Sequence, residues 1–144
     1  MATLAISLSG CSAFGPEKPS VFSLKVGDCF NDPSAKSDDV VSEVEIVKCK
    51  SAHDNEIFHH ALMTGSTYPG TDGAYAQAEE ACAPTFFDFI GFSGDPAGYE
   101  YELEYSYFVP TQDSWDNAND RAIDCFAYNA DASQLTDTLE GAAK

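Results

Sequence analysis

The sequence predicts an α+β fold in which an antiparallel sheet of about five strands carries one kinked helix on one face and is held by two disulfides. Stretches with the pattern of β-strands occur before and after one stretch whose apolar residues recur at spacings of three and four. Four cysteines lie in or next to these stretches, while a fifth stands near the start of the chain. At 144 residues, the chain has the size of a single domain with its own hydrophobic core.

Three strands are expected ahead of the helix, over residues 23–30, 40–49 and 56–64. In the first of them, Leu24 and Val26 share one face. Because the segment between the second and third strands is short and polar, we expect these two strands to pair as neighbours.

The helix is expected over residues 73–91. Pro84 interrupts its pattern, because proline lacks the N–H that a helix interior requires. We expect a kink there, or two short helices with Pro84 in the first turn of the second. The apolar stripe, which would face the sheet, consists of Tyr75, Ala78, Cys82, Phe86 and Phe89.

A fourth strand is expected over residues 99–109, where tyrosine and apolar residues alternate with acidic and other residues. This alternation predicts one buried face and one wet, acidic face. Several tyrosines on one face are unusual, because buried hydroxyl groups need hydrogen-bond partners. If that face is partly open, it would suit stacking against sugar rings or a protein partner. The candidate binding residues on it are Tyr99, Tyr101, Tyr105 and Tyr107.

The remaining segments complete the organisation of the chain. The last strand is expected over residues 121–129, so that the folded domain covers residues 21–129. Residues 12–20 are small, polar and proline-bearing, which is typical of a tether. Residues 130–144 form a tail, in which a short helix over 133–142 would place Leu135 and Leu139 on one side. A disordered tail is the alternative.

The four domain cysteines allow three pairings. Cys29 and Cys49 stand at the ends of the first two strands, where antiparallel pairing would let them face each other. Cys82 lies on the apolar face of the helix and Cys125 is central in the last strand, which suits a link between layers. We therefore predict the disulfides Cys29–Cys49 and Cys82–Cys125. No Cys-x-x-Cys occurs and the spacings match no zinc template, so we expect no metal at these cysteines.

The fifth cysteine, Cys11, ends the run Leu8-Ser9-Gly10-Cys11, which resembles the lipobox of bacterial lipoproteins. The resemblance implies a lipid on Cys11 that anchors the protein to the outer face of the cytoplasmic membrane without spanning it. The even number of remaining cysteines also favours an oxidising compartment. Residues 1–9 contain no Lys or Arg, whereas an export signal begins with positive charge. We therefore expect a longer signal upstream and treat residues 1–11 as its truncated end. The alternative is a chance match, with Cys11 a free thiol in a disordered tail.

Composition and motifs exclude several classes of function. The net charge of −17 rules against nucleic-acid binding and against docking flat on anionic lipid, because basic patches drive both associations. Outside residues 1–11, no stretch of the sequence approaches the roughly 18 consecutive apolar residues that a membrane-spanning helix needs. There is no His-Glu-x-x-His, phosphate loop or glycine-rich dinucleotide turn. We expect no catalytic residues, no metal and no cofactor.

The densest group of potential metal ligands is His53, Asp54, Glu56 and His59. In an extended segment the two histidines share one parity and the two acids share the other, so the four would not converge. We expect His53 and Asp54 instead to shape the loop between strands through local hydrogen bonds, and we keep His53 as a candidate binding residue.

Arg121 is the only arginine, and it follows Trp115 and a run of Asp and Asn residues. We expect it to make a structural pair with a carboxylate and a cation–π contact with Trp115. The alternative is an anchor for an anionic group of a wall or lipid partner, so Trp115 and Arg121 are candidate binding residues. Residues 113–120 do not fit a calcium loop, because the required glycine and terminal glutamate are missing.

Four stretches together resemble a known family. They are Val26-Gly27-Asp28-Cys29-Phe30, then Val47-Lys48-Cys49 with Ala52-His53-Asp54-Asn55-Glu56-Ile57-Phe58, then Tyr68-Pro69-Gly70, and the stretch from Pro110 through Trp115 and Arg121 to Cys125. This composite resembles the septum formation family of actinobacterial envelope proteins over about residues 22–128. The resemblance implies an extracytoplasmic, often membrane-tethered domain and supports the two cysteine pairs. It supplies no catalytic residues, and the family's name suggests a link to cell division.

These observations lead to one expected function and one alternative. We expect a non-catalytic lipoprotein that acts as a binding or scaffolding module, contacting an envelope protein or a cell-wall component. The alternative is a hydrolase of wall glycan that uses paired carboxylates as acid and base. A concave cleft with two facing carboxylates near Tyr99 to Tyr107 would favour the hydrolase, while a flat or filled surface would favour the module.

Overall fold

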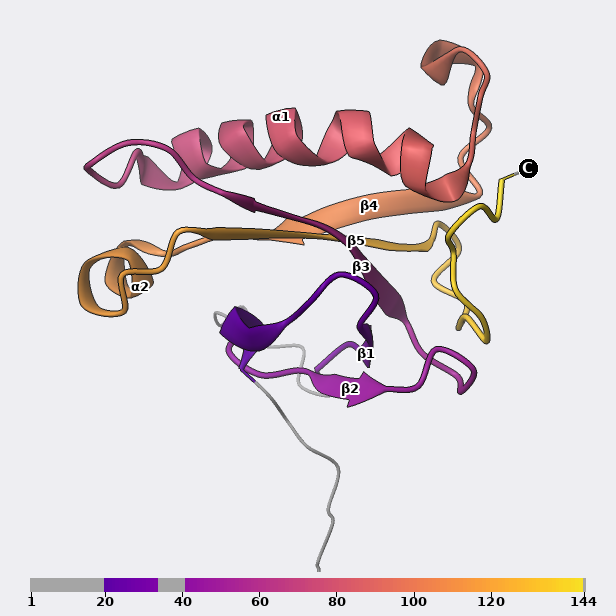
Figure 1. The fold of residues 1–144 in the computed structure, drawn as a ribbon, viewed down its shortest axis with the longest axis horizontal. Coiled ribbons are helices and arrows are strands. Elements are labelled where there is room, and N and C mark those ends of the chain that lie inside the picture. Colours follow the sequence, from indigo (N-terminus) through magenta and orange to yellow (C-terminus); the bar gives the residue numbers. More distant parts are fainter. Residues whose placement is uncertain (1–19, 34–40, 144) are drawn as a thin grey trace, which may run out of the picture.

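The computed structural model describes residues 20–33 and 41–143. Figure 1 shows one long helix lying across strands of a sheet, with the short strands of that sheet and their loops farther from the helix. In chain order the elements are the 3₁₀-helix η1 (Val21–Ser23), strands β1 (Cys29–Asn31), β2 (Glu45–Val47) and β3 (Asn55–Leu62), helix α1 (Gly70–Ile90), the 3₁₀-helix η2 (Pro96–Gly98), strand β4 (Leu103–Phe108), helix α2 (Gln112–Asn117) and strand β5 (Ala122–Asn129).

The five strands form one sheet in the order β2-β1-β3-β5-β4, and every neighbouring pair is antiparallel. The predicted α+β fold is therefore confirmed. The expected pairing of the second strand with the third is wrong, because β1 lies between them. Cys29 pairs with Val47 on one side and with Glu56 on the other. The polar link between β2 and β3 thus passes the end of β1 instead of forming a tight hairpin.

The first strand is much shorter than expected. Residues 21–23 form η1, and the chain then turns, since the Asp28 N–H donates to the carbonyl of Lys25 at 3.0 Å. Gly27 has a φ of 91°, a conformation that side chains disfavour and that a strand would not contain. The turn also separates two residues that were expected to share a face, since Leu24 is 6% exposed and Val26 is 59% exposed. The second strand is also shorter than residues 40–49, because β2 has only three residues.

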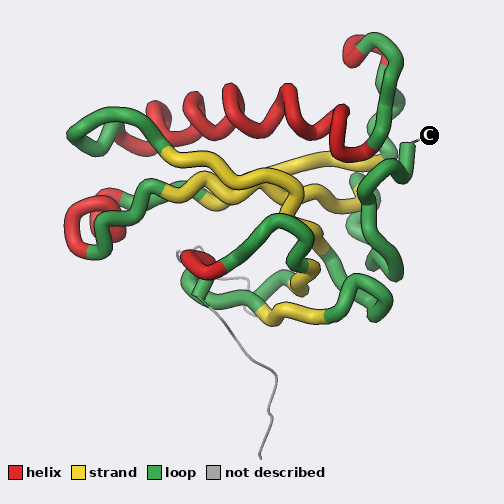
Figure 2. The backbone as a smooth tube through the Cα atoms, viewed as in Figure 1, coloured by secondary structure: helices red, strands yellow, loops and turns green. Residues whose placement is uncertain are grey.

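Helix α1 is a single helix of 21 residues that runs through Pro84, so the expected division into two short helices does not occur (Figure 2). Next to the proline, the Thr85 hydroxyl donates to the carbonyl oxygens of Ala81 and Cys82 at 3.1 and 3.0 Å. The helix ends at Ile90, and the next residue, Gly91, has a φ of 75° and an N–H that donates to carbonyls of the last turn. Glycine suits this left-handed helix end because it has no Cβ.

Two hydrophobic cores lie on the two faces of the sheet. The helix-side core fills the space between α1 and strands β3, β5 and β4. The opposite core lies on the other face and is formed by Val21, Leu24, Phe30, Val44 and Ile57, with Phe108 and Phe126 packed against it. Because Phe108 lies 4.8 Å from Phe126 between ring centroids, the face of β4 that was expected to be wet and acidic is apolar at this end.

The C-terminal segment, residues 130–143, contains no helix and is packed on the sheet. Leu135 and Leu139 are 6% and 5% exposed and belong to the helix-side core. The N–H groups of Gly141 and Ala143 donate to carbonyls of Phe89 and Ile90 at the end of α1, each at 2.8 Å. The expectation of a helical or disordered tail, with folding limited to residues 21–129, is therefore wrong for the described part of this segment.

None of the helices in the described part of the chain combines the length and the apolar character that crossing a membrane requires.

Candidate functional site

The disulfide between Cys82 and Cys125 joins α1 to β5. The Cα atoms of this pair are 5.7 Å apart, and both side chains are fully buried in the helix-side core. The predicted link between helix and sheet is therefore confirmed. A disulfide sulfur is no thiolate, so this pair offers no nucleophile.

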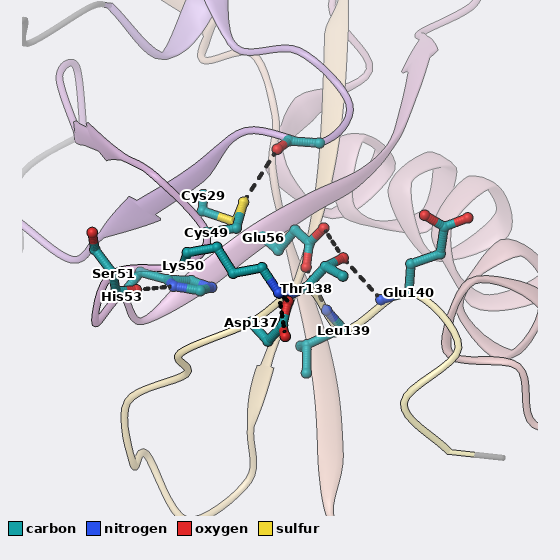
Figure 3. Close-up of a disulfide and its surroundings, with 11 residues drawn as sticks. Cys29, Cys49, Lys50, Ser51, His53, Glu56, Asp137, Thr138, Leu139 and Glu140 are labelled. Carbon is teal, nitrogen blue, oxygen red and sulfur yellow. Dashed lines mark hydrogen bonds and ion pairs between the residues drawn. A yellow bond between two sulfur atoms is a disulfide. The ribbon is translucent and has the colours of Figure 1, made fainter.

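The second predicted disulfide, between Cys29 and Cys49, is also confirmed and joins β1 to the chain just after β2 (Figure 3). A carboxylate oxygen of Glu56 and the two sulfur atoms lie within 4.8 Å of one another. Within residues 20–33 and 41–143, this is the only group of three potential ligand atoms so close together. Its two sulfur atoms are bonded to each other and are not available as metal ligands.

His53 is fully buried and holds the loop before β3. Its ring Nδ1 lies 2.8 Å from the carbonyl oxygen of Ser51, which can only accept, so Nδ1 carries the proton. Its backbone N–H donates to the Leu135 carbonyl at 3.0 Å, and its carbonyl accepts from the Leu135 N–H at 2.7 Å. The residue thus makes the local hydrogen bonds expected of it and also binds the C-terminal segment, which the sequence pattern does not indicate.

Asp54 and Asn55 connect β3 to two loops. A carboxylate oxygen of Asp54 accepts from the Asp32 N–H at 3.0 Å, and the other accepts from the Gln134 side-chain amide at 3.1 Å. The Asn55 amide donates to the Asp32 carboxylate at 2.7 Å. These polar groups are therefore occupied by contacts within the domain.

Glu56 is 3% exposed, yet its carboxylate has two good donors. One oxygen accepts from the Thr138 hydroxyl at 2.7 Å and the other from the Leu139 N–H at 2.6 Å (Figure 3). Nearby, the Lys50 ammonium donates a hydrogen bond to the Asp137 carboxylate and forms an exposed ion pair with it. This hydrogen bond lowers the pKa of Asp137. We call His53, Glu56 and Lys50, with the residues they bind in 135–139, the C-terminal clamp.

The four potential metal ligands do not converge. His53 and Glu56 serve the C-terminal clamp, and Asp54 binds the loops. His59 pairs with Cys125 in the ladder between β3 and β5 and is partly buried.

Trp115 and Arg121 form the expected cation–π contact, with the guanidinium carbon 3.4 Å from the ring centroid. The guanidinium donates to the backbone carbonyls of Trp115 at 3.0 Å and Asp120 at 2.6 Å. Within the described ranges it has no ion pair with a carboxylate, so the expected partner is replaced by carbonyls. Trp115 belongs to α2, a helix that the sequence analysis missed. The sequence feature that marks the start of α2 is its N-cap residue Thr111, whose hydroxyl accepts a hydrogen bond from the Ser114 N–H at 3.1 Å.

The four candidate tyrosines do not form one face. Tyr99 is buried, and its hydroxyl accepts from the Leu103 N–H at 3.1 Å. Tyr101 is 74% exposed and lies before β4. Tyr105 packs beneath α1 and donates its hydroxyl to Glu79 at 2.6 Å, so burial and this carboxylate raise its pKa. Tyr107 is half-buried, with its ring 5.9 Å from that of Tyr75 between centroids.

Surface depressions follow β4 along its length, and neighbouring depressions share a tyrosine. We call this series of four depressions the β4 track. It begins at the end of β4 near Tyr75 and Tyr107, continues past Tyr105 and ends around Tyr101. The carboxylates that line it are Glu79, Glu102, Glu104, Asp120 and Asp131.

Asp124 and His60 form a pair that the sequence analysis missed. The Asp124 side chain is 5% exposed and accepts from Nδ1 of His60 at 2.7 Å. Burial raises the pKa of Asp124, and the bond to His60 opposes that shift only in part. One feature of the sequence could have indicated that Asp124 is buried: it stands between two apolar residues, Ile123 and Cys125, in a predicted strand.

Comparison with known proteins gives one match. The family model described as septum formation matches residues 26–144. No curated protein and no solved structure matches the chain.

Proposed function

The chain belongs to the septum formation family, and from this premise we propose that it is a non-catalytic binding or scaffolding module of the cell envelope. In this proposal it contributes to septum formation by contacting another envelope protein or a cell-wall component. It is held at the outer face of the cytoplasmic membrane by a lipid on Cys11, a residue that lies outside the described part of the chain.

One observation carries the proposal: three of the four residues in the densest group of potential metal ligands are occupied by contacts within the domain, while depressions along β4 remain accessible. His53 and Glu56 hold the C-terminal segment, and Asp54 ties two loops to β3. A site for chemistry needs side chains that are free to reach a substrate, whereas a binding module needs an accessible surface.

The glycan hydrolase has less support. Such an enzyme needs one carboxylic acid whose pKa is raised and a second carboxylate close by. Two carboxylates, Glu102 and Asp131, line one end of the β4 track. Hydrogen bonds from Ser133 lower the pKa of Asp131, so it is a poor general acid. Asp124 does have a raised pKa, but its side chain is 5% exposed and is hydrogen-bonded to His60, so it is not placed to reach a glycan.

The two disulfides support the proposed location. Disulfides persist in oxidising compartments and are rare in the cytosol. The lipid anchor is tested by feeding cells an alkyne fatty acid and isolating the protein. Label on the wild type and none on Cys11→Ala is the expected result. Equal labelling of both proteins would contradict the anchor.

The role in septum formation is tested by deleting the gene in its own host and imaging septa with a membrane dye. We expect fewer or misplaced septa and rescue by the wild-type gene. Normal septa in the deletion strain would overturn the role. In parallel, the purified protein is incubated with peptidoglycan. Release of soluble fragments that is lost in Glu102→Gln would replace the module with the hydrolase.

A further inference from the structure

Strand β4 forms one edge of the sheet, and its outer side has backbone groups that no described strand pairs with. On the inner side, the Glu102 carbonyl accepts from the Ala130 N–H at 3.0 Å. The Leu103 N–H points the other way and donates to the Tyr99 hydroxyl. In an antiparallel ladder the direction alternates along the strand, so the N–H and C=O groups of Tyr105 and Tyr107 point outward. These four groups match the hydrogen-bonding pattern of an added strand.

The side chains at this edge provide a surface for such a strand. The β4 track runs along the same edge, bordered by Tyr75, Tyr101, Tyr105 and Tyr107. At about 3.3 Å per residue, the six residues of β4 extend over roughly 20 Å. That length accommodates an extended peptide of about six residues, with alternate side chains resting against the tyrosines.

The charge of this surface selects its partner. Glu79, Glu102 and Glu104 line the track, and none of its lining residues is Lys, Arg or His. Glu79 and Glu104 accept hydrogen bonds from tyrosine hydroxyls, which leave their negative charges uncompensated. A second copy of this chain would place carboxylates opposite carboxylates and would bring another net charge of −17 to the edge. A basic strand would instead pair its charges with these residues.

We propose that the outer edge of β4 binds an extended, basic segment of a partner protein by strand addition. This inference rests on the proposed function, for which it names the binding surface and the class of partner. The partner strand forms main-chain hydrogen bonds with Tyr105 and Tyr107 and alternates Lys or Arg with apolar residues.

The probe is the synthetic peptide acetyl-Lys-Val-Lys-Val-Lys-Val-amide, added to the folded domain with its disulfides intact. Binding should slow hydrogen exchange of the Tyr105 and Tyr107 amides, measured by NMR, and should weaken as salt is added. Two control peptides separate the contributions. Backbone N-methylation at alternate residues removes strand donors and should weaken binding by about tenfold or more. Replacing every Lys with Glu should abolish it.

A pair of charge-reversal variants locates the site. Glu79→Lys with Glu102→Lys changes two residues of the track, and we expect at least about tenfold weaker binding of the Lys-Val peptide. The matched control, Glu80→Lys with Glu140→Lys, makes the same change in charge at exposed residues outside the track and should retain binding. Amide spectra of both variants verify that they are folded.

Three results would overturn the inference: unprotected Tyr105 and Tyr107 amides, equal loss of binding in both variants, or self-association through β4 seen by sedimentation. The septum assay distinguishes failure of the proposed function from failure of the proposed binding site at β4. If the track variant loses the peptide but still rescues the deletion strain, the proposed function stands and the β4 edge is not its site. If deletion of the gene leaves septa normal, the proposed function fails, whether or not the peptide binds to the domain.

Discussion

The two faces of the sheet are stabilised in different ways. The helix-side core packs a 21-residue helix against three strands, and its disulfide is fully buried at the centre. The opposite core has five buried residues beneath two strands of three residues each. Strands this short are not stable by themselves, and their disulfide lies at the margin, where Cys49 is partly exposed. The comparison indicates that the helix-side core combines extensive packing with a buried cross-link, whereas the opposite face depends on a small core and a cross-link at its margin.

The largest expected effect is the loss of the helix-side disulfide. In Cys82→Ala with Cys125→Ala, the unfolded chain regains the freedom of a loop with a sequence separation of 43, worth about 4 kcal/mol. Because both sulfur atoms are buried, a cavity adds to this cost. We expect global destabilisation in urea unfolding followed by circular dichroism. A change below about 1 kcal/mol would show that packing alone holds this core.

The opposite disulfide should matter less and more locally. For Cys29→Ala with Cys49→Ala, the sequence separation is 20 and the expected loss is about 3 kcal/mol or less. Hydrogen exchange should rise first in β1 and β2 while α1 stays protected. Equal acceleration in α1 would mean that the two faces of the sheet unfold as one unit.

The C-terminal clamp gives a third, smaller test. Glu56→Gln preserves the size of the side chain but weakens two charge-assisted hydrogen bonds to Thr138 and Leu139. We expect a loss of about 1 to 2 kcal/mol and faster hydrogen exchange over residues 135–143. Glu140→Gln is the control, because Glu140 is exposed and should leave both measurements unchanged.

The smallest effect should come from Asp124, on the face of the sheet opposite α1. Burial raises its folded-state pKa above the ordinary value of 3.8, so the folded state holds its proton to higher pH than the unfolded state does. The stability linked to this proton is full below pH 3.8 and is lost as the pH rises through the raised pKa. Asp124→Asn resembles the protonated form. Its stability relative to wild type should therefore be higher at pH 7 than at pH 3, as measured by thermal unfolding. An equal difference at both pH values would refute the raised pKa.

The parts of the fold that could be predicted include the longest strands and the features set by local chemistry. β3 and β5, each eight residues long, match their expected ranges to within two residues at each end, whereas β4 covers only residues 103–108 of the expected 99–109. The two disulfides followed from the expected positions of Cys29 and Cys49 at strand ends, of Cys82 on the apolar face of the helix and of Cys125 in the centre of the last strand. The contact between Arg121 and Trp115 followed from their proximity in the chain.

The parts that could not be predicted depend on contacts between distant residues. β1 lies between β2 and β3 because it pairs with both of them. Strands as short as β1 and β2 have too few residues for a sequence pattern to indicate this pairing. The C-terminal segment is ordered because Glu56, more than 80 positions earlier, accepts its hydrogen bonds. The open edge of β4 exists only because β5, which follows it in the chain, takes the inner position.

The central position of β5 also dictates when the native sheet can be assembled. β5 begins at Ala122 and lies between β3 and β4, which do not pair with each other. In a nascent chain that extends only to the end of α2, β3 and β4 therefore lack the strand that pairs with both of them. Cys82 also lacks its disulfide partner, Cys125. Such an intermediate has little to gain from early collapse, because the pairings that would reward it span long stretches of chain. The domain can therefore complete its sheet only after β5 has been synthesised, and a chain that stops before residue 122 lacks the strand that joins β3 to β4.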